Sequence, residues 1–116
     1  MNSLALALPL LPGKTEEWKS FTQAIHSGGL RRAEMEEFQR RNGITLERWF
    51  LQHTPHGDFV VVYMEGDIQK AFTNLPISTH PFDTWLKENW LRLEGIDFNK
   101  PLAGPPPHLH YEFKAG

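Results

Sequence analysis

The chain contains no cysteine among its 116 residues. That absence excludes a disulfide-bonded scaffold, a thiolate nucleophile and zinc bound through cysteine. Chains without disulfides are typical of a reducing compartment, so we expect a cytoplasmic protein. A chain of this length buries about two-thirds of its unfolded surface, which is enough for one core. Residues 1–116 are therefore expected to form a single domain.

An excess of positive charge is also missing. Twelve Lys and Arg residues stand against fourteen Asp and Glu residues, which leaves a net charge of -2. The arginine pairs Arg31/Arg32 and Arg40/Arg41 are interleaved with glutamates. No basic stripe is available to follow a phosphate backbone, so nucleic acid is not an expected partner.

Long apolar runs and catalytic motifs are absent as well. The segment LALALPLLPG is too short to cross a bilayer and lacks the preceding basic residue of a secretory signal. We therefore interpret it as a first strand and expect no membrane partner. The sequence has no Gly-rich phosphate loop, nucleophile elbow or HExxH motif. The abundant residues are aromatic, with four Trp and eight Phe, and they need a core, a cavity or an interface.

Hydrophobic spacing predicts the order of strands and helices. The residues LALAL alternate large and small side chains as a strand does, and apolar residues at helical spacing follow Thr15. The stretch WFLQHTPHGDFVVVY predicts a β-hairpin, because a turn with Pro55 and Gly57 joins two apolar segments. Predicted strands cover about residues 4–8, 44–53, 58–65 and 108–114. Predicted helices begin near Thr15, Arg31, Asp67 and Pro81.

The resulting order is β-α-β-β-α-β, with each helical crossover broken into two pieces. Two such halves give an α+β fold with a four-stranded antiparallel sheet and helices on one face. The other face is then bare, although it carries a substantial share of large apolar side chains. A symmetric partner is the simplest cover, so we expect a homodimer.

Three segments, LPGKTEEW, NGITLERWFLQHTPHGDFVVVYMEGD and HPFDTWLKENWLRLEGIDF, resemble an uncharacterised bacterial family in the dimeric α/β-barrel superfamily. The resemblance spans nearly the whole chain and implies a ferredoxin-like fold in which two sheets pack across a dimer axis. It also implies a small-molecule cavity between sheet and helices or between sheets. Members of the superfamily include cofactor-free monooxygenases, haem-handling enzymes, isomerases, dehydratases and ligand binders. The fold alone therefore does not select an activity.

Histidines supply the candidate catalytic and metal-binding groups. His53 shares a strand face with Trp49, and imidazole titrates near neutral pH, so His53 is a candidate general base for a phenol or quinol. An incidental histidine at the end of a strand is the alternative. His108 and His110 point the same way from the last predicted strand and are close enough to bind one metal ion. Because no third ligand is evident, we favour a solvent-facing pair.

Aromatic residues supply the candidate ligand site. The predicted ligand-binding residues are Trp18, Trp49, Tyr63, Phe82, Trp85 and Asn89, with Trp90 beside them. The same Trp and Phe residues are also typical core fillers, and that alternative stays open. We expect an apolar or aromatic ligand bound without a cofactor, in a cofactor-free monooxygenase or isomerase. The alternatives are a non-catalytic dimeric binding or interaction module and a metal-dependent enzyme that uses His108 and His110.

Overall fold

Three antiparallel strands form the sheet in the part of the chain that the computed structural model describes, residues 3–102 and 104–116. The strands are β1 (Ser3–Pro9), β2 (Ile44–Thr54) and β3 (Gly57–Gly66). The helices are α1 (Thr15–His26), α2 (Gly29–Arg41), α3 (Ile68–Asn74), the 3₁₀ helix η1 (Leu75–Ile77) and α4 (Pro81–Glu94). The predicted α+β class is confirmed. No helix in the two described ranges is both long enough and apolar enough to cross a membrane.

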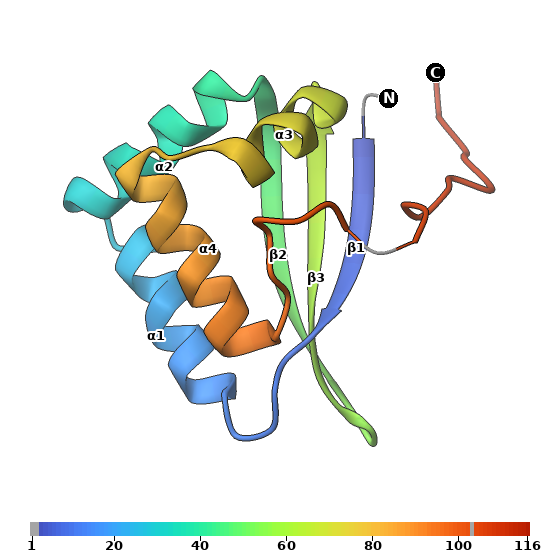
Figure 1. The fold of residues 1–116 in the computed structure, drawn as a ribbon. Coiled ribbons are helices and arrows are strands. Elements are labelled where there is room, and N and C mark those ends of the chain that lie inside the picture. Colours follow the sequence, from blue (N-terminus) through green and yellow to red (C-terminus); the bar gives the residue numbers. More distant parts are fainter. Residues whose placement is uncertain (1–2, 103) are drawn as a thin grey trace.

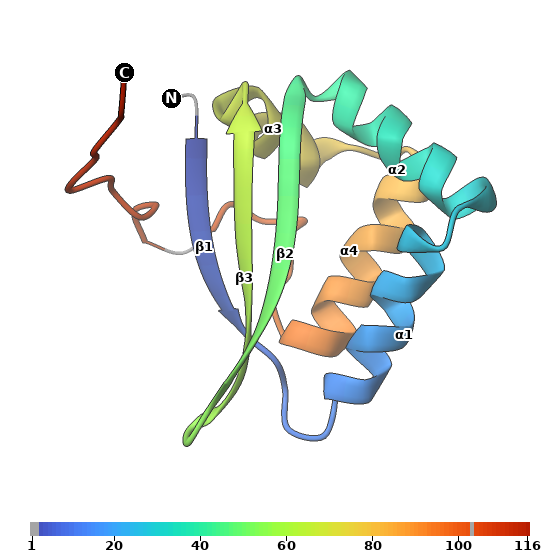
Figure 2. The ribbon, with the colours of Figure 1, turned by 180° about the vertical axis from the view of Figure 1, so that it is seen from behind.

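Strand β3 is the centre of the sheet. It pairs with β1 on one side and with β2 on the other, so that Val62 lies opposite both Leu6 and Trp49. Residues directly opposite one another on paired strands share a face, so these three side chains point the same way. The helices lie on that side of the sheet (Figure 1). Seen from behind, the opposite face is crossed by no described helix (Figure 2).

The β2–β3 hairpin turns at residues 54–57. Gly57 has a φ of 123°, a conformation that residues with a side chain rarely adopt. Thr54 Oγ1 donates a hydrogen bond to the carbonyl oxygen of Gly57 at 2.6 Å and accepts one from the His56 amide at 3.1 Å. The turn geometry determines the register of the hairpin, and with it the face on which Trp49 lies.

Helix α4 has distinct start and stop signals. His80 is its N-cap and accepts a hydrogen bond from the Phe82 amide at 3.3 Å, while Pro81 occupies the first turn, where no donor is needed. Gly95 follows the helix with a φ of 73°, the left-handed conformation that ends many helices. Glu94 is therefore placed in the last turn of α4, where its side chain is buried.

An aromatic cluster joins the helices to the sheet. Phe21 of α1 stacks on Trp49 of β2 with 6.0 Å between ring centroids, and it lies 5.4 Å from Trp85 of α4. Phe82 lies 5.6 Å from Trp85 and 6.3 Å from Phe38 of α2. Three helices and one edge strand thus share a single core.

The predicted fourth strand is not formed. Residues 108–114 adopt no strand, and the side chains of Leu109, Tyr111 and Phe113 are exposed. The segment runs beyond the free edge of β1 (Figure 1), beside Ser3 and Ala5 in a surface hollow. Apolar alternation predicts which side chains share a face, but a strand also needs hydrogen bonds to a neighbouring edge. The described sheet therefore ends at β1.

Candidate functional site

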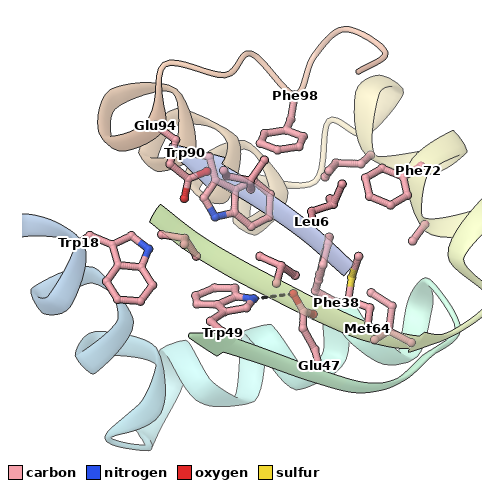
Figure 3. A pocket seen from close by; sticks show the side chains of 16 residues that line it. Leu6, Trp18, Phe38, Glu47, Trp49, Met64, Phe72, Trp90, Glu94 and Phe98 are labelled. Carbon is pink, nitrogen blue, oxygen red and sulfur yellow. Dashed lines mark hydrogen bonds between the residues drawn. The ribbon is translucent and has the colours of Figure 1, made fainter. Parts of the chain in front are cut away.

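A cavity lies between the helix-facing side of the sheet and the helices. Its volume is about 60 Å³. Side chains from the strands, from all four α-helices and from the segment after α4 point into it (Figure 3). Most of this lining is apolar and rich in aromatic rings, which is the usual character of a small-molecule site.

The sheet supplies the floor of the cavity. Leu6 and Leu8 come from β1, and Val60, Val62 and Met64 come from β3. Within each strand these residues are two positions apart, so they lie on one face. The alternation in β1 and the continuous apolar run in β3 therefore both make the floor apolar.

Strand β2 adds a carboxyl group to the wall. Glu47 accepts a hydrogen bond from Trp49 Nε1 at 2.8 Å and another from Gln39 Nε2 at 3.3 Å. Burial raises the pKa of Glu47, and the two hydrogen bonds oppose that effect. Its protein partners hold this carboxyl group in position at the cavity wall.

The helices supply aromatic walls. Trp18 comes from α1, Phe38 from α2 and Phe72 from α3. Trp90 of α4 and Phe98, which follows that helix, meet edge to face with 5.0 Å between ring centroids. Through Phe98, the segment that follows α4 also contributes to the cavity lining, in contact with α4 itself.

Glu94 brings an unpaired carboxyl group to the cavity. It lies one helical turn after Trp90, so both residues share a face of α4 (Figure 3). Only 4% of Glu94 is exposed, and its Oε1 has no hydrogen-bond partner among the described residues. Burial raises its pKa to about 8, because desolvation penalises the charged form. At neutral pH this carboxyl group is therefore mostly protonated.

The ionisable side chains of the cavity are both carboxyl groups. Glu94 on α4 and Glu47 on β2 lie on different walls (Figure 3), and none of the described lining residues is Lys, Arg or His. An anion in the cavity would meet two carboxyl groups and no basic partner, which is unfavourable in a desolvated site. The arrangement favours a neutral or positively charged ligand.

Two surface grooves adjoin the cavity. One, of about 470 Å³ between α1 and α2, shares Trp18 and Trp49 with it. The other, of about 680 Å³, lies between β1, α3 and the chain after α4, and shares Leu6, Phe72 and Phe98. A cavity of about 150 Å³ is known to hold benzene. A ring-sized ligand would therefore have to displace some of these shared side chains.

The structure brings part of the predicted aromatic set to the cavity. Trp18 and Trp49 line it, and so does Trp90. Phe82 and Trp85 lie instead in the aromatic core between the helices, 5.6 Å apart. Helical spacing marks all of these positions as inward-facing, but only the packing of the helices determines which of them meet a void.

The two predicted polar contacts also lie away from the cavity. Tyr63 is on the opposite face of the sheet, where its hydroxyl donates to Glu65 Oε2 at 2.5 Å. The same hydrogen bond raises the pKa of Tyr63. Asn89 Nδ2 donates to the carbonyl oxygen of Trp85 at 2.8 Å, and its Oδ1 accepts from Arg92 at 2.8 Å. Both side chains are thus engaged within their own element.

His53, the candidate general base, lies near the end of the hairpin and is exposed. Its Nδ1 is 2.8 Å from Asp58 Oδ1. Asp58 Oδ2 also accepts a hydrogen bond from Thr15 at 2.6 Å, and the bonds from Thr15 and His53 lower the pKa of Asp58. His53 is not among the cavity-lining residues.

His108 and His110 lie in the exposed C-terminal segment. They line the surface hollow beside β1 together with Glu112 and Glu65. Across the ranges that the structure describes, no group of three or more His, Asp or Glu side chains is arranged to hold a metal ion.

The two cavity carboxyl groups were not among the predicted site residues. A signal for each is nevertheless present in the sequence. Glu94 falls on the apolar stripe of α4, four residues after Trp90 and eight after Leu86, where a charged residue is out of pattern. Glu47 interrupts the alternation that places Trp49 and Leu51 on one face of β2.

Comparisons with protein-family models, with curated protein sequences and with solved structures found no match for this chain. The cavity and its side chains are therefore the features from which a function can be inferred.

Proposed function

We propose that this protein binds a small, mainly apolar or aromatic molecule in the cavity between its sheet and its helices. The unpaired carboxyl group of Glu94, in an otherwise apolar and aromatic wall, carries this proposal. A buried polar group without a partner costs about 1–3 kcal/mol. A ligand with one polar group on an apolar body would supply the missing partner and fill the space beside it.

The proposal is tested by filling the cavity. Ala71 of α3 is buried and lines it, so Ala71→Leu places added methyl groups in the void. We expect this variant to stay folded and to bind phenol at least about tenfold more weakly than the wild type. Phenol binding is followed through NMR shifts of the tryptophan indole groups.

Ala24→Leu is the matched control, because Ala24 is exposed on α1 and receives the same substitution in another helix. Its phenol affinity should equal that of the wild type. If Ala71→Leu binds phenol as well as Ala24→Leu does, the cavity is not the binding site.

A catalytic role is a second candidate. Glu47 and Glu94 both have raised pKa values and line one cavity, and paired carboxyl groups can move a proton between two positions of a substrate. This arrangement supports a cofactor-free isomerase. The monooxygenase alternative has His53 as its base, and His53 lies outside the lining of this cavity, so the quinol would bind at the hairpin end instead. His53→Ala should then abolish turnover, and unchanged turnover would remove His53 from the mechanism. Binding without turnover would identify a non-catalytic module.

We also propose that this protein forms a homodimer. On the uncovered face of the sheet, Phe50 is 53% exposed, and the register places it beside Val61. Tyr63 lies two residues further along the same face of β3. A second copy would cover these side chains with the same patch. In the dimer, residues 108–114 form the fourth strand against the free edge of β1, beside which they already lie.

Phe50→Lys tests the dimer. We expect it to shift the wild-type dimer to a monomer in sedimentation experiments, because a lysine would be buried at the interface without a partner. Leu30→Lys on α2 is the control, since Leu30 is also exposed but belongs to the helical side. A wild-type protein that sediments as a monomer contradicts the dimer proposal and leaves the cavity proposal intact.

A further inference from the structure

The composition of the cavity wall fits a ligand with a positive charge. Trp18, Trp49 and Trp90 border the cavity together with Glu47 and Glu94, and no basic residue is among the described lining residues. The faces of aromatic rings attract cations, and carboxylates form strong charge-assisted hydrogen bonds with ammonium groups. An organic ammonium ion makes both kinds of contact at once.

We propose that the ligand is an alkylammonium compound, with its charged head group held by Glu94 and the rings of Trp90 and Trp49; this inference rests on the proposed binding function of the cavity. The head group is a primary or methylated ammonium. Its N–H donors, or its polarised methyl groups, face the free Oε1 of Glu94.

The rest of the molecule shows how this protein neutralises a buried carboxyl group. Asp83, as buried as Glu94, accepts two hydrogen bonds from the guanidinium group of Arg41 at 2.9 and 3.2 Å. Glu94 has no cation of the protein within reach of its free oxygen. A cationic ligand would take the place that Arg41 occupies at Asp83.

A neutral ligand fits this wall less well. A carbonyl group could accept a hydrogen bond from protonated Glu94, but it would gain nothing from the second carboxyl group at Glu47. It would also gain no cation–π attraction from the tryptophan rings. A cation gains from the tryptophan rings and from each carboxyl group in its ionised form, and this difference favours the ammonium ion.

The dimensions of the site determine where the alkyl chain goes. The cavity of about 60 Å³ has room for a head group only. The groove of about 680 Å³ shares Leu6, Phe72 and Phe98 with the cavity, and its other walls are mainly apolar. The chain of the ligand therefore runs past Phe98 into this groove, under the segment that follows α4.

The test compares n-hexylammonium with hexan-1-ol, which have the same chain length and differ in charge. Binding is measured by calorimetry at about pH 7 and low salt. We expect the ammonium compound to bind at least about tenfold more tightly than the alcohol. Glu94→Gln should remove this preference. Glu88→Gln, an exposed substitution on the same helix, should keep it.

The pH dependence provides a second measurement that needs no variant. The ammonium ion requires ionised Glu94, so its affinity should rise about tenfold per pH unit below about pH 8 and level off above it. Glu47 of β2 is the other titratable group that faces the cavity; the described lining residues of β1, β3, α1, α2 and α3 carry no charge. The affinity for hexan-1-ol should not rise with pH.

Each outcome decides between the two proposals. Equal binding of the two compounds, or an ammonium affinity that does not rise with pH, overturns the charged ligand and leaves the cavity as a binding site. Failure of both compounds to bind, together with failure of phenol, overturns the binding function itself. If Glu94→Gln does not fold, the pH series of the wild-type protein gives the answer.

Discussion

The two ends of helix α4 each bury a carboxyl group and treat it in opposite ways. In the first turn, the Asp83 side chain is 2% exposed. It accepts hydrogen bonds from Arg41 and one from Ser78 Oγ at 2.6 Å. In the last turn, Glu94 is buried to a similar degree, but its Oε1 has no partner among the described residues.

The pKa values of the two groups follow from their partners. Burial alone raises the pKa of Asp83, but the hydrogen bonds from Arg41 and Ser78 and the charge of Arg41 outweigh it, so the pKa lies below its ordinary value. At Glu94 burial acts without such opposition and raises the pKa to about 8. Equal burial therefore has opposite consequences, depending on whether the fold supplies a cation.

The surroundings of the two ends also differ. Near Asp83, the buried Lys87 donates to the carbonyl oxygens of Leu75 and Ser78, both at 2.9 Å, and so joins α4 to η1 and the chain that follows it. This end is a closed structural network. The Glu94 end borders a cavity and leaves a hydrogen-bonding group free. A buried group that the fold satisfies stabilises the protein, whereas one that it leaves unsatisfied is available to a ligand.

Breaking the closed network should have the largest effect. Asp83→Ala leaves Arg41 and Ser78 without their partner, and we expect it to lower the free energy of unfolding by about 3–5 kcal/mol. Urea unfolding measures this change. Glu37→Ala is the control, because Glu37 is the half-exposed second partner of Arg41 at 2.8 Å, and it should cost less than about 1 kcal/mol. Equal losses would mean that the buried pair of Asp83 with Arg41 stabilises the protein no more than the half-exposed pair of Glu37 with Arg41.

The unpaired Glu94 in the last turn of α4 should make the free energy of unfolding depend on pH, and we expect this effect to be smaller than that of Asp83→Ala. Between the ordinary pKa of 4.5 and the folded value of about 8, the unfolded chain loses the Glu94 proton while the folded protein keeps it. Stability therefore falls as the pH rises through this range and levels off above it, by a few kcal/mol in all.

The Glu94→Gln variant has no ionisable group at this position. The part of the pH-dependent loss of stability that comes from Glu94 should therefore be absent from this variant. Urea unfolding of the variant and of the wild type at about pH 5, 7 and 9 checks this, with Glu88→Gln as the exposed control. Parallel pH curves for Glu94→Gln and the wild type would contradict the raised pKa of Glu94. They would also remove the contrast with Asp83.

Much of the fold was accessible from local patterns. Leu4, Leu6 and Leu8 predict β1 because a strand alternates its faces, and Pro81 and Gly95 mark the two ends of α4. The C-terminal segment shows where such patterns are insufficient. Leu109, Tyr111 and Phe113 alternate as clearly as the residues of β1, yet residues 108–114 form no strand in the structure. Alternation is a property of one segment, whereas pairing needs a second one.

The site was less accessible, for a related reason. Trp18 and Trp49 were predicted to line a cavity and do, but Phe82 and Trp85 have the same inward-facing pattern and lie in the filled core. Glu47 and Glu94 are out of pattern on apolar faces, and this signal could have identified both. Neither periodicity nor composition indicates whether a buried carboxyl group meets an arginine, as Asp83 does, or an empty space.

The order of helices and strands, their inward faces and the absence of thiol chemistry thus follow from the amino-acid sequence alone, because spacing, caps and turn residues act over a few neighbouring positions. The position of the cavity, the free carboxyl group of Glu94 and the unpaired edge of β1 were decided only in the tertiary structure. These features depend on how segments far apart in the chain meet, and a void or a missing partner exists only once they have met.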